Sequence, residues 1–209
     1  MSQILNRPVV SPSIYALILT SPNLRQALIP EGPLSSPYEV LSYQGTLTLH
    51  DKKGTKATFE RTQQVRFEQD GVSAILDHIW GDGVLITNYY NSAGSIEDSF
   101  KDQGCRHLMI ELRKRMSRGQ ALEFKAERTI MEGFKGQENW WEINIDHPVH
   151  QLENSIIFPK TRSCQEAILQ SGDKQTALPV IRLSDGRAVV RFSIAKPFAG
   201  IPYRVSWKW

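Results

Sequence analysis

The chain lacks the short motifs that identify several large enzyme classes by sequence. It has no Gly-x-x-x-x-Gly-Lys loop for phosphates, no Gly-x-Gly-x-x-Gly turn for dinucleotides, no Cys-x-x-Cys pair and no Gly-x-Ser-x-Gly elbow. It also has only two cysteines in 209 residues, Cys105 and Cys164. We expect both to be reduced thiols, because one distant pair does not make the disulfide framework of a small secreted domain.

Long apolar runs and a strong charge of one sign are also lacking. The most apolar stretch, Ile14–Leu19, is too short to span a bilayer and is soon followed by Pro22. The first residues hold no basic segment followed by a long apolar core, so we predict a cytoplasmic protein that does not enter a membrane. The net charge of +3, from 25 basic and 22 acidic residues, does not by itself make a nucleic-acid-binding surface.

Proline is concentrated in residues 1–38, which hold six of the eleven prolines. Two short helical turns fit between them, and Ser21 before Pro22 has the form of an N-cap followed by a first helical residue. We predict a short helical, proline-rich N-terminal arm that packs on the remainder of the chain through residues such as Leu24 and Leu28. The alternative is an extended tail that becomes ordered only on a partner.

Residues 39–209 show the period-two alternation of β-strands. Leucines alternate with threonines over residues 46–49, and turn signals recur about every eight to fifteen residues, the spacing of a sandwich or barrel. We therefore predict a mostly β domain, an antiparallel β-sandwich of about nine to twelve strands. The pattern leaves short helical turns open at Ile96–Phe100 and Cys164–Gln170.

The last segment of the chain has an aromatic face. Tyr203, Val205, Trp207 and Trp209 alternate with polar or charged residues, so they share one side of a strand. Each aromatic side chain can bury about 150–250 Å². We expect this strand to dock in the core, and its removal to unfold the protein.

Two arginines stand at positions where the alternation predicts apolar neighbours. Arg61 shares a face with Phe59, and Arg128 shares a face with Phe124. A guanidinium buried alone is costly, so each is expected to pair with a carboxylate or to line a wet pocket. Ion pairs between strands at sheet edges, or a register shifted by a bulge, are favoured over an anion-binding pocket. The candidate partners are Asp77, Asp82 and Asp98.

No catalytic or metal site is predicted. Histidines next to acids, in Asp77–His78 and Asp146–His150, match no metal-ligand spacing in a β context. Cys105 and His107 can share a strand face, but no third orienting group announces a nucleophile. We expect no cofactor, and a binding protein is favoured over an enzyme.

Four positive charges are gathered in six residues, Arg113, Lys114, Arg115 and Arg118. We place them in a loop between two strands, where they could contact phosphates. No aromatic residues are interleaved with them, although proteins that bind single strands usually stack the bases on aromatic side chains. A solvated loop is favoured, and nucleic-acid binding stays an alternative.

Two adjacent tryptophans must point to opposite faces of one strand. Trp141 aligns with Ile143 and Ile145 and is assigned to the core, whereas Trp140 points outward. An outward tryptophan is a common anchor at protein interfaces. The equal alternative is that Trp140 packs under the N-terminal arm.

Several short segments, taken in order, resemble a β-rich module found at the C-terminal end of multidomain bacterial proteins of conflict or signalling systems. They are Trp80–Gly83, Glu127–Ile130, Trp140–Glu142, Ile156–Pro159, Leu183–Arg187 and Tyr203–Trp209. The resemblance covers about residues 40–209 and consists mainly of turn and core residues. The chain departs from those proteins in having only the proline-rich arm upstream, with no effector domain.

The resemblance implies a non-catalytic recognition or adaptor module whose partner is another protein. Trp140, Leu24 and Leu28 are the predicted contacts. The alternatives are a small-ligand or anion-binding domain, enzymatic or not, that uses Arg61 and Arg128, and a nucleic-acid-binding domain. The oligomeric state is not predicted.

If Trp140 is an interface residue, Trp140→Ala should change the free energy of unfolding by no more than about 1 kcal/mol, the scale of a surface change. Thermal or chemical denaturation measures this. A loss several times larger places the side chain in the core and rejects the interface assignment.

Overall fold

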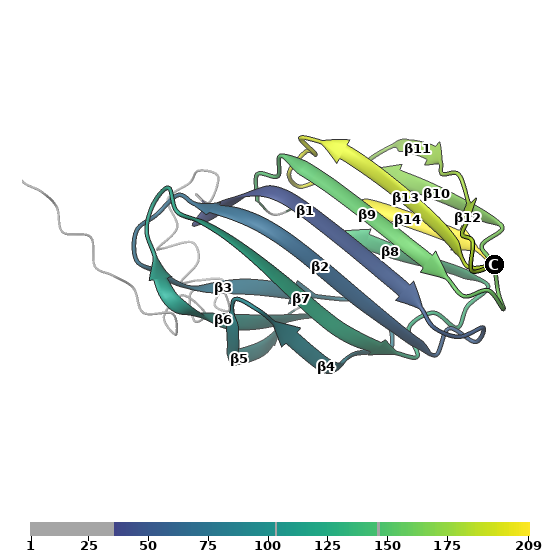
Figure 1. Ribbon diagram of the computed structural model, residues 1–209, viewed down its shortest axis with the longest axis horizontal. Coiled ribbons are helices and arrows are strands. Elements are labelled where there is room, and N and C mark those ends of the chain that lie inside the picture. Colours follow the sequence, from purple (N-terminus) through teal and green to yellow (C-terminus); the bar gives the residue numbers. More distant parts are fainter. Residues whose placement is uncertain (1–35, 103, 146) are drawn as a thin grey trace, which may run out of the picture. The chain divides into compact units, whose positions relative to one another are not determined.

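The alternation of the sequence produces fourteen strands in the part of the chain that the structure describes (Figure 1). The structure is a computed structural model that describes residues 36–102, 104–145 and 147–209. Within these ranges no residue is helical, so no helix there is long and apolar enough to cross a membrane. The prediction of a mostly β fold is confirmed.

The largest sheet has seven strands in the order β12-β13-β9-β1-β2-β7-β4. Neighbouring strands are antiparallel except β1 and β9, which are parallel. In chain order the strands of this sheet are β1 (Tyr38–Leu49), β2 (Lys56–Phe67), β4 (Val84–Asn91), β7 (Ala121–Met131), β9 (Gln151–Phe158), β12 (Ile181–Arg182) and β13 (Ala188–Ala195).

Two smaller antiparallel sheets complete the described fold. One has four strands in the order β11-β10-β14-β8, and the other has three in the order β3-β6-β5. The four strands are β8 (Glu138–Ile143), β10 (Glu166–Ser171), β11 (Lys174–Ala177) and β14 (Tyr203–Lys208). The three strands are β3 (Val72–Ile79), β5 (Gly94–Asp102) and β6 (Cys105–Met116).

Both small sheets pack on the same face of the large sheet. Phe59 and Arg61 stand two residues apart on β2 and therefore point to the same side. The Phe59 ring centroid lies 4.6 Å from that of Trp141 in the four-stranded sheet. Arg61 instead forms an ion pair with Asp77 in the three-stranded sheet. Side chains from all three sheets can therefore converge where the sheets meet.

The C-terminal strand supplies an aromatic part of the core. Tyr203, Val205, Trp207 and Trp209 are all buried, as the alternation predicts. The centroid of the Trp207 ring lies 5.7 Å from that of Phe158 in the large sheet, in an edge-on arrangement that aromatic pairs favour. β14 thus holds the four-stranded sheet against β9.

Three features differ from the predicted sandwich. The fourteen strands exceed the nine to twelve expected, they form three sheets, and β1 pairs with β9 in parallel. Ile96–Phe100 lies within β5, and Cys164–Gln170 leads into β10, so neither is a helical turn. The reason is long-range pairing: β5 bonds to β6, and β10 bonds to β11 and β14, partners that a local pattern does not reveal.

The predicted arm falls almost entirely outside the described residues. Its helical turns, Leu24 and Leu28 lie there, so they stay predictions. Residues 36–209 form one compact unit, and β1 already begins at Tyr38, inside the range 1–38 that we assigned to the arm.

Trp207→Ala should lower the free energy of unfolding by about 3–5 kcal/mol, the usual cost of deleting a buried aromatic side chain. Trp207 is only 2% exposed, whereas Phe198, the matched control, is 73% exposed. Phe198→Ala should stay within about 0.5 kcal/mol of the parent. Urea denaturation followed by circular dichroism measures both, and similar effects in the two variants would contradict the core role of β14.

Candidate functional site

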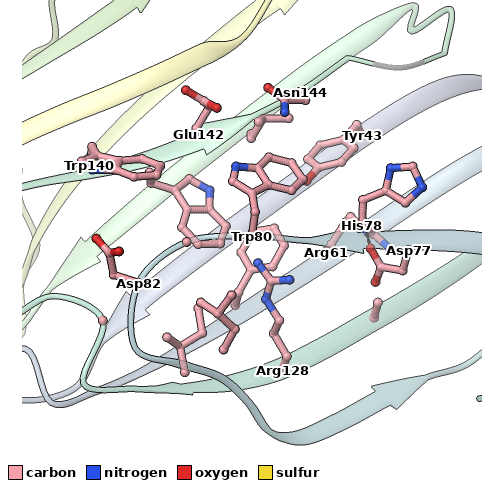
Figure 2. A pocket seen from close by; sticks show the side chains of 18 of the residues that line it. Tyr43, Arg61, Asp77, His78, Trp80, Asp82, Arg128, Trp140, Glu142 and Asn144 are labelled. Atoms are coloured by element: carbon pink, nitrogen blue, oxygen red, sulfur yellow. Dashed lines mark hydrogen bonds and ion pairs between the residues drawn. The ribbon is translucent and has the colours of Figure 1, made fainter. Parts of the chain in front are cut away.

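A cavity of about 350 Å³ lies where the three sheets meet, and Figure 2 shows side chains that line it. Its walls come from β1, β2, β4 and β7 of the large sheet, from β3 and the turn after it, and from β8 with its flanking segments. Cavities of this size hold small organic ligands. Eight of the lining side chains are aromatic: Tyr38, Tyr43, Phe59, Trp80, Tyr89, Phe134, Trp140 and Trp141.

A glycine-rich turn brings Trp80 and Asp82 to the cavity. The sequence from residue 80 is Trp-Gly-Asp-Gly, directly after the end of β3. Gly83 has a φ of +80°, and a Cβ atom there would lie 2.4 Å from the backbone oxygen of Met131 on β7. A glycine is therefore required for the turn to approach β7 this closely.

A chain of polar groups crosses the inner end of the cavity. Arg61 Nη1 donates to Asp77 Oδ1 over 2.9 Å, joining β2 to β3. The Tyr89 hydroxyl on β4 donates to Asp77 Oδ2 over 2.8 Å, and Asn91 Nδ2 donates to the Tyr89 oxygen over 3.1 Å. Both carboxylate oxygens of Asp77 are therefore engaged, and three strands meet at this one side chain.

Asp77 is ionised although it is only 6% exposed. Burial alone would raise the pKa of Asp77, but the charges of Arg61 and Arg128 and the hydrogen bond from Tyr89 hold that pKa below its ordinary value. Burial and the neighbouring carboxylate raise the pKa of Tyr89, so the phenol keeps its proton and acts as a donor. The inner end of the cavity thus holds a carboxylate whose negative charge is balanced by Arg61.

Arg128 lies in the same cavity in a different environment. It is 8% exposed, and its guanidinium carbon lies 5.2 Å from the centre of the Phe59 ring and 5.5 Å from that of the Trp141 ring. With the described residues it forms no hydrogen bond or ion pair, and its buried Nε has no partner. Burial lowers the pKa of Arg128, and attraction to Asp77 does not fully offset this. Among the described residues, Arg128 is therefore a buried cation that contacts aromatic faces and feels the charge of Asp77 without a direct ion pair.

The structure brings together the two arginines that the sequence singled out. Arg61 and Arg128 line one cavity, and Asp77, one of the three candidate carboxylates, is the partner of Arg61. Asp82 also lines the cavity, whereas Asp98 does not. The favoured prediction of ion pairs at sheet edges holds only in part. Arg61 does form an ion pair with a carboxylate of another strand, but β2 is an interior strand of the large sheet. Arg128, on the interior strand β7, forms no ion pair with the described residues.

Trp140 points outward from β8 as predicted, but another side chain covers part of it. The guanidinium of Arg204 lies 4.6 Å from the centre of the Trp140 ring. Arg204 is held there by Glu142, with Nη2 and Oε2 2.7 Å apart. Trp140 is half-buried and Trp141 is buried, and both line the cavity. The ring therefore has a partner within the chain.

The basic cluster is placed differently from the prediction. Arg113, Lys114 and Arg115 lie in β6, which continues to Met116, so only Arg118 stands in the turn that follows. All four basic side chains are exposed, and none of them lines the cavity. The strand extends further than expected because β3 pairs with β6 as far as Met116.

The remaining candidates are dispersed. Cys105 donates a weak hydrogen bond to the backbone oxygen of Arg106, and Cys164 is a buried free thiol. His107 lies between the rings of His78 and Phe100, each 4.7 Å away. Among the described residues, no group of three or more His, Cys, Asp or Glu side chains is arranged to hold a metal ion.

Sequence reasoning did not identify Tyr89 and Asn91 as members of the polar chain. They stand two residues apart and so share a face of β4, and this spacing is visible in the sequence. The pairing that sets Tyr89 opposite Arg128 joins β4 to β7 across a long stretch of chain. No local pattern reveals it.

Comparisons with known proteins identify the fold but not the family. No protein-family model and no curated protein sequence matches the chain. An M1 zinc metallopeptidase variant from Deinococcus radiodurans, solved with the peptide Tyr-Ser-Ala, is similar at 11% identity and a TM-score of 0.51; the match covers 81% of this chain and 42% of that one. A putative protease from Parabacteroides distasonis is similar at 11% identity and a TM-score of 0.52, over 84% of this chain and 41% of that one. The chain spans about two fifths of the length of these proteins, and at this identity the likeness shows the fold alone.

Removal of the charge should destabilise the protein much more at Arg61 than at Arg128. Arg61→Met leaves the buried Asp77 carboxylate without its cation, so the free energy of unfolding should fall by about 3–5 kcal/mol. Arg128→Met removes a buried cation that has no hydrogen-bond partner among the described residues, so the loss should not exceed about 1 kcal/mol. Urea denaturation of both variants at neutral pH tests this, and equal losses would contradict the contrast.

Proposed function

We propose that this protein binds a small anionic ligand in the cavity between its three sheets, and that Arg128 is the residue that holds the anion. The observation that carries the proposal is the state of Arg128: 92% buried, in the wall of a cavity of about 350 Å³, and without a hydrogen-bond partner among the described residues. A buried charge of this kind is costly unless a partner arrives.

The setting of Arg128 suits recognition of an anion. Phe59 and Trp141 lie against the guanidinium and restrict its orientation. A guanidinium presents two parallel N–H groups that match the two oxygens of a carboxylate or phosphate. Because the Arg128 guanidinium is already held in one orientation, less side-chain entropy is lost when a ligand binds. An anion would supply the hydrogen bonds that the described residues do not give to Arg128.

The proposal is one of binding without catalysis. Among the described residues that line the cavity, none is Ser, Thr or Cys, the side chains that most often act as activated nucleophiles. Asp77 is already occupied by Arg61 and Tyr89, so both of its oxygens accept hydrogen bonds and neither is left for proton transfer.

The other functions that the sequence predicts stay predictions. A protein-interaction role through Trp140, Leu24 and Leu28, within a bacterial conflict or signalling system, rests on the resemblance described above. The partial exposure of Trp140 is compatible with it, although Arg204 covers one face of the ring. Nucleic-acid binding through the exposed cluster Arg113–Arg118 likewise rests on charge alone.

Isothermal titration calorimetry with small organic anions at constant ionic strength tests the proposal. Acetate, phenylacetate and phenyl phosphate serve as probes. At least one should bind with a stoichiometry of one, and Arg128→Met should weaken its binding about tenfold or more, the scale of a charge-assisted hydrogen-bonded contact. Arg115→Met, which removes an exposed arginine remote from the cavity walls, is the matched control and should not change the affinity. No binding by any probe, or equal losses in the two variants, would overturn the proposal.

A further inference from the structure

We infer that the ligand carries a single carboxylate on an aromatic body, and that Asp77 is the residue that limits the site to one negative charge. This inference rests on the proposed function and names the class of ligand for the same cavity. Three observations support it: the balance of buried charges, the number of guanidinium groups left for a ligand, and the composition of the walls.

Among the described lining residues, the buried charges of the cavity sum to one positive charge. Arg61 and Arg128 are cationic, and Asp77 is anionic because Arg61 and Tyr89 stabilise its charged form. A ligand with one negative charge therefore leaves this interior neutral. A dianion would leave one uncompensated negative charge beside the Asp77 carboxylate, and charges that are buried without compensation cost several kcal/mol in proteins.

The number of guanidinium groups left to bind a ligand also favours a single carboxylate. Arg61 donates from Nη1 to Asp77, so its charge is compensated within the protein, although its buried Nε has no hydrogen-bond partner among the described residues. Arg128 is the guanidinium without a partner among the described residues. One guanidinium fork matches the two oxygens of a carboxylate, whereas a phosphate dianion has three charged oxygens and needs further donors.

The remaining walls of the cavity disfavour additional negative charge. Lys135 is the only further lysine or arginine among the lining residues, and it is paired with Glu132. Four more acids line the cavity besides Glu132 and Asp77: Asp82, Glu127, Glu138 and Glu142. Figure 2 shows Asp82 and Glu142 on the side of Trp80 away from Asp77. A multiply charged anion would be repelled by these carboxylates.

The body of the ligand is inferred from the aromatic lining. Eight of the aromatic residues in the described part of the chain line this one cavity. Trp80 and Tyr43 lie together near its centre in Figure 2, and Trp140 lies at one side. Aromatic rings pack favourably against one another in offset or edge-on arrangements. A planar aromatic group joined to one carboxylate therefore suits the cavity better than an aliphatic acid of the same charge.

The experiment compares three probes by calorimetry at pH 8, where phenyl phosphate is a dianion and phenylacetate and acetate carry one charge. The parent protein should bind phenylacetate at least tenfold more tightly than either phenyl phosphate or acetate. Asp77→Asn raises the buried charge from one to two positive units. It should shift the ratio of affinities about tenfold or more in favour of phenyl phosphate.

A double variant separates charge from damage to the fold. Arg61→Gln combined with Asp77→Asn removes the ion pair but keeps one buried positive charge, so it should bind with the preference of the parent. Equal affinity of the parent for phenylacetate and phenyl phosphate, or a ratio unchanged in Asp77→Asn, would overturn the inference and leave anion binding by Arg128 intact. If no probe binds to the parent, the proposed function itself fails. If Asp77→Asn does not fold, the ratios of the parent and the double variant decide.

Discussion

The ion pair between Arg61 and Asp77 is the interaction on which the cavity depends. Apolar packing holds the sheets together, but it is non-directional and does not determine where one sheet sits on another. The ion pair is directional, and it places β3 at a defined position on β2. Tyr89 of β4 donates to the same carboxylate, so β3 is tied to two strands of the large sheet through one buried side chain. This wall of the cavity is therefore held by the Asp77 carboxylate together with the strand pairing of the large sheet.

Arg128 is a second buried arginine, and no carboxylate of the described residues forms an ion pair with it. It lies directly opposite Phe59 on β2 and opposite Tyr89 on β4, so neighbours on both sides of β7 enclose it. The aromatic faces of Phe59 and Trp141 offer it cation–π attraction, which is weaker than a hydrogen-bonded ion pair. The protein thus carries one stabilised and one poorly compensated arginine in the same interior. This difference is the basis for placing the proposed ligand at Arg128.

The proposed function rests on side chains inside the cavity and not on residues of the outer surface. Trp140 and the basic residues at the end of β6 attract attention in the sequence, yet Trp140 already stacks with Arg204 and the basic side chains stand in solvent. The fold is shared with much longer peptidase chains at 11% identity. A fold supports many activities, so function has to be argued from the side chains that converge in this chain.

The sequence by itself determined the local structure. Its alternation placed the buried face of the C-terminal strand, assigned Trp141 rather than Trp140 to the core and marked Arg61 and Arg128 as inward-facing. These conclusions follow because a strand has a period of two, which any short segment displays. The glycines at positions 81 and 83 also stand where φ is positive, a conformation that glycine adopts readily.

Only the tertiary structure decided how these elements combine. The parallel pairing of β1 with β9, the third sheet and the assignment of residues 96–100 to β5 depend on partners far away in the chain. The choice of Asp77 over Asp82 and Asp98 as the partner of Arg61 is of the same kind. Many strand pairings satisfy one alternating pattern, and the free energies that select among them come from contacts between distant segments. The residues of the cavity could therefore be proposed singly from the sequence, whereas their convergence came from the packing of three sheets.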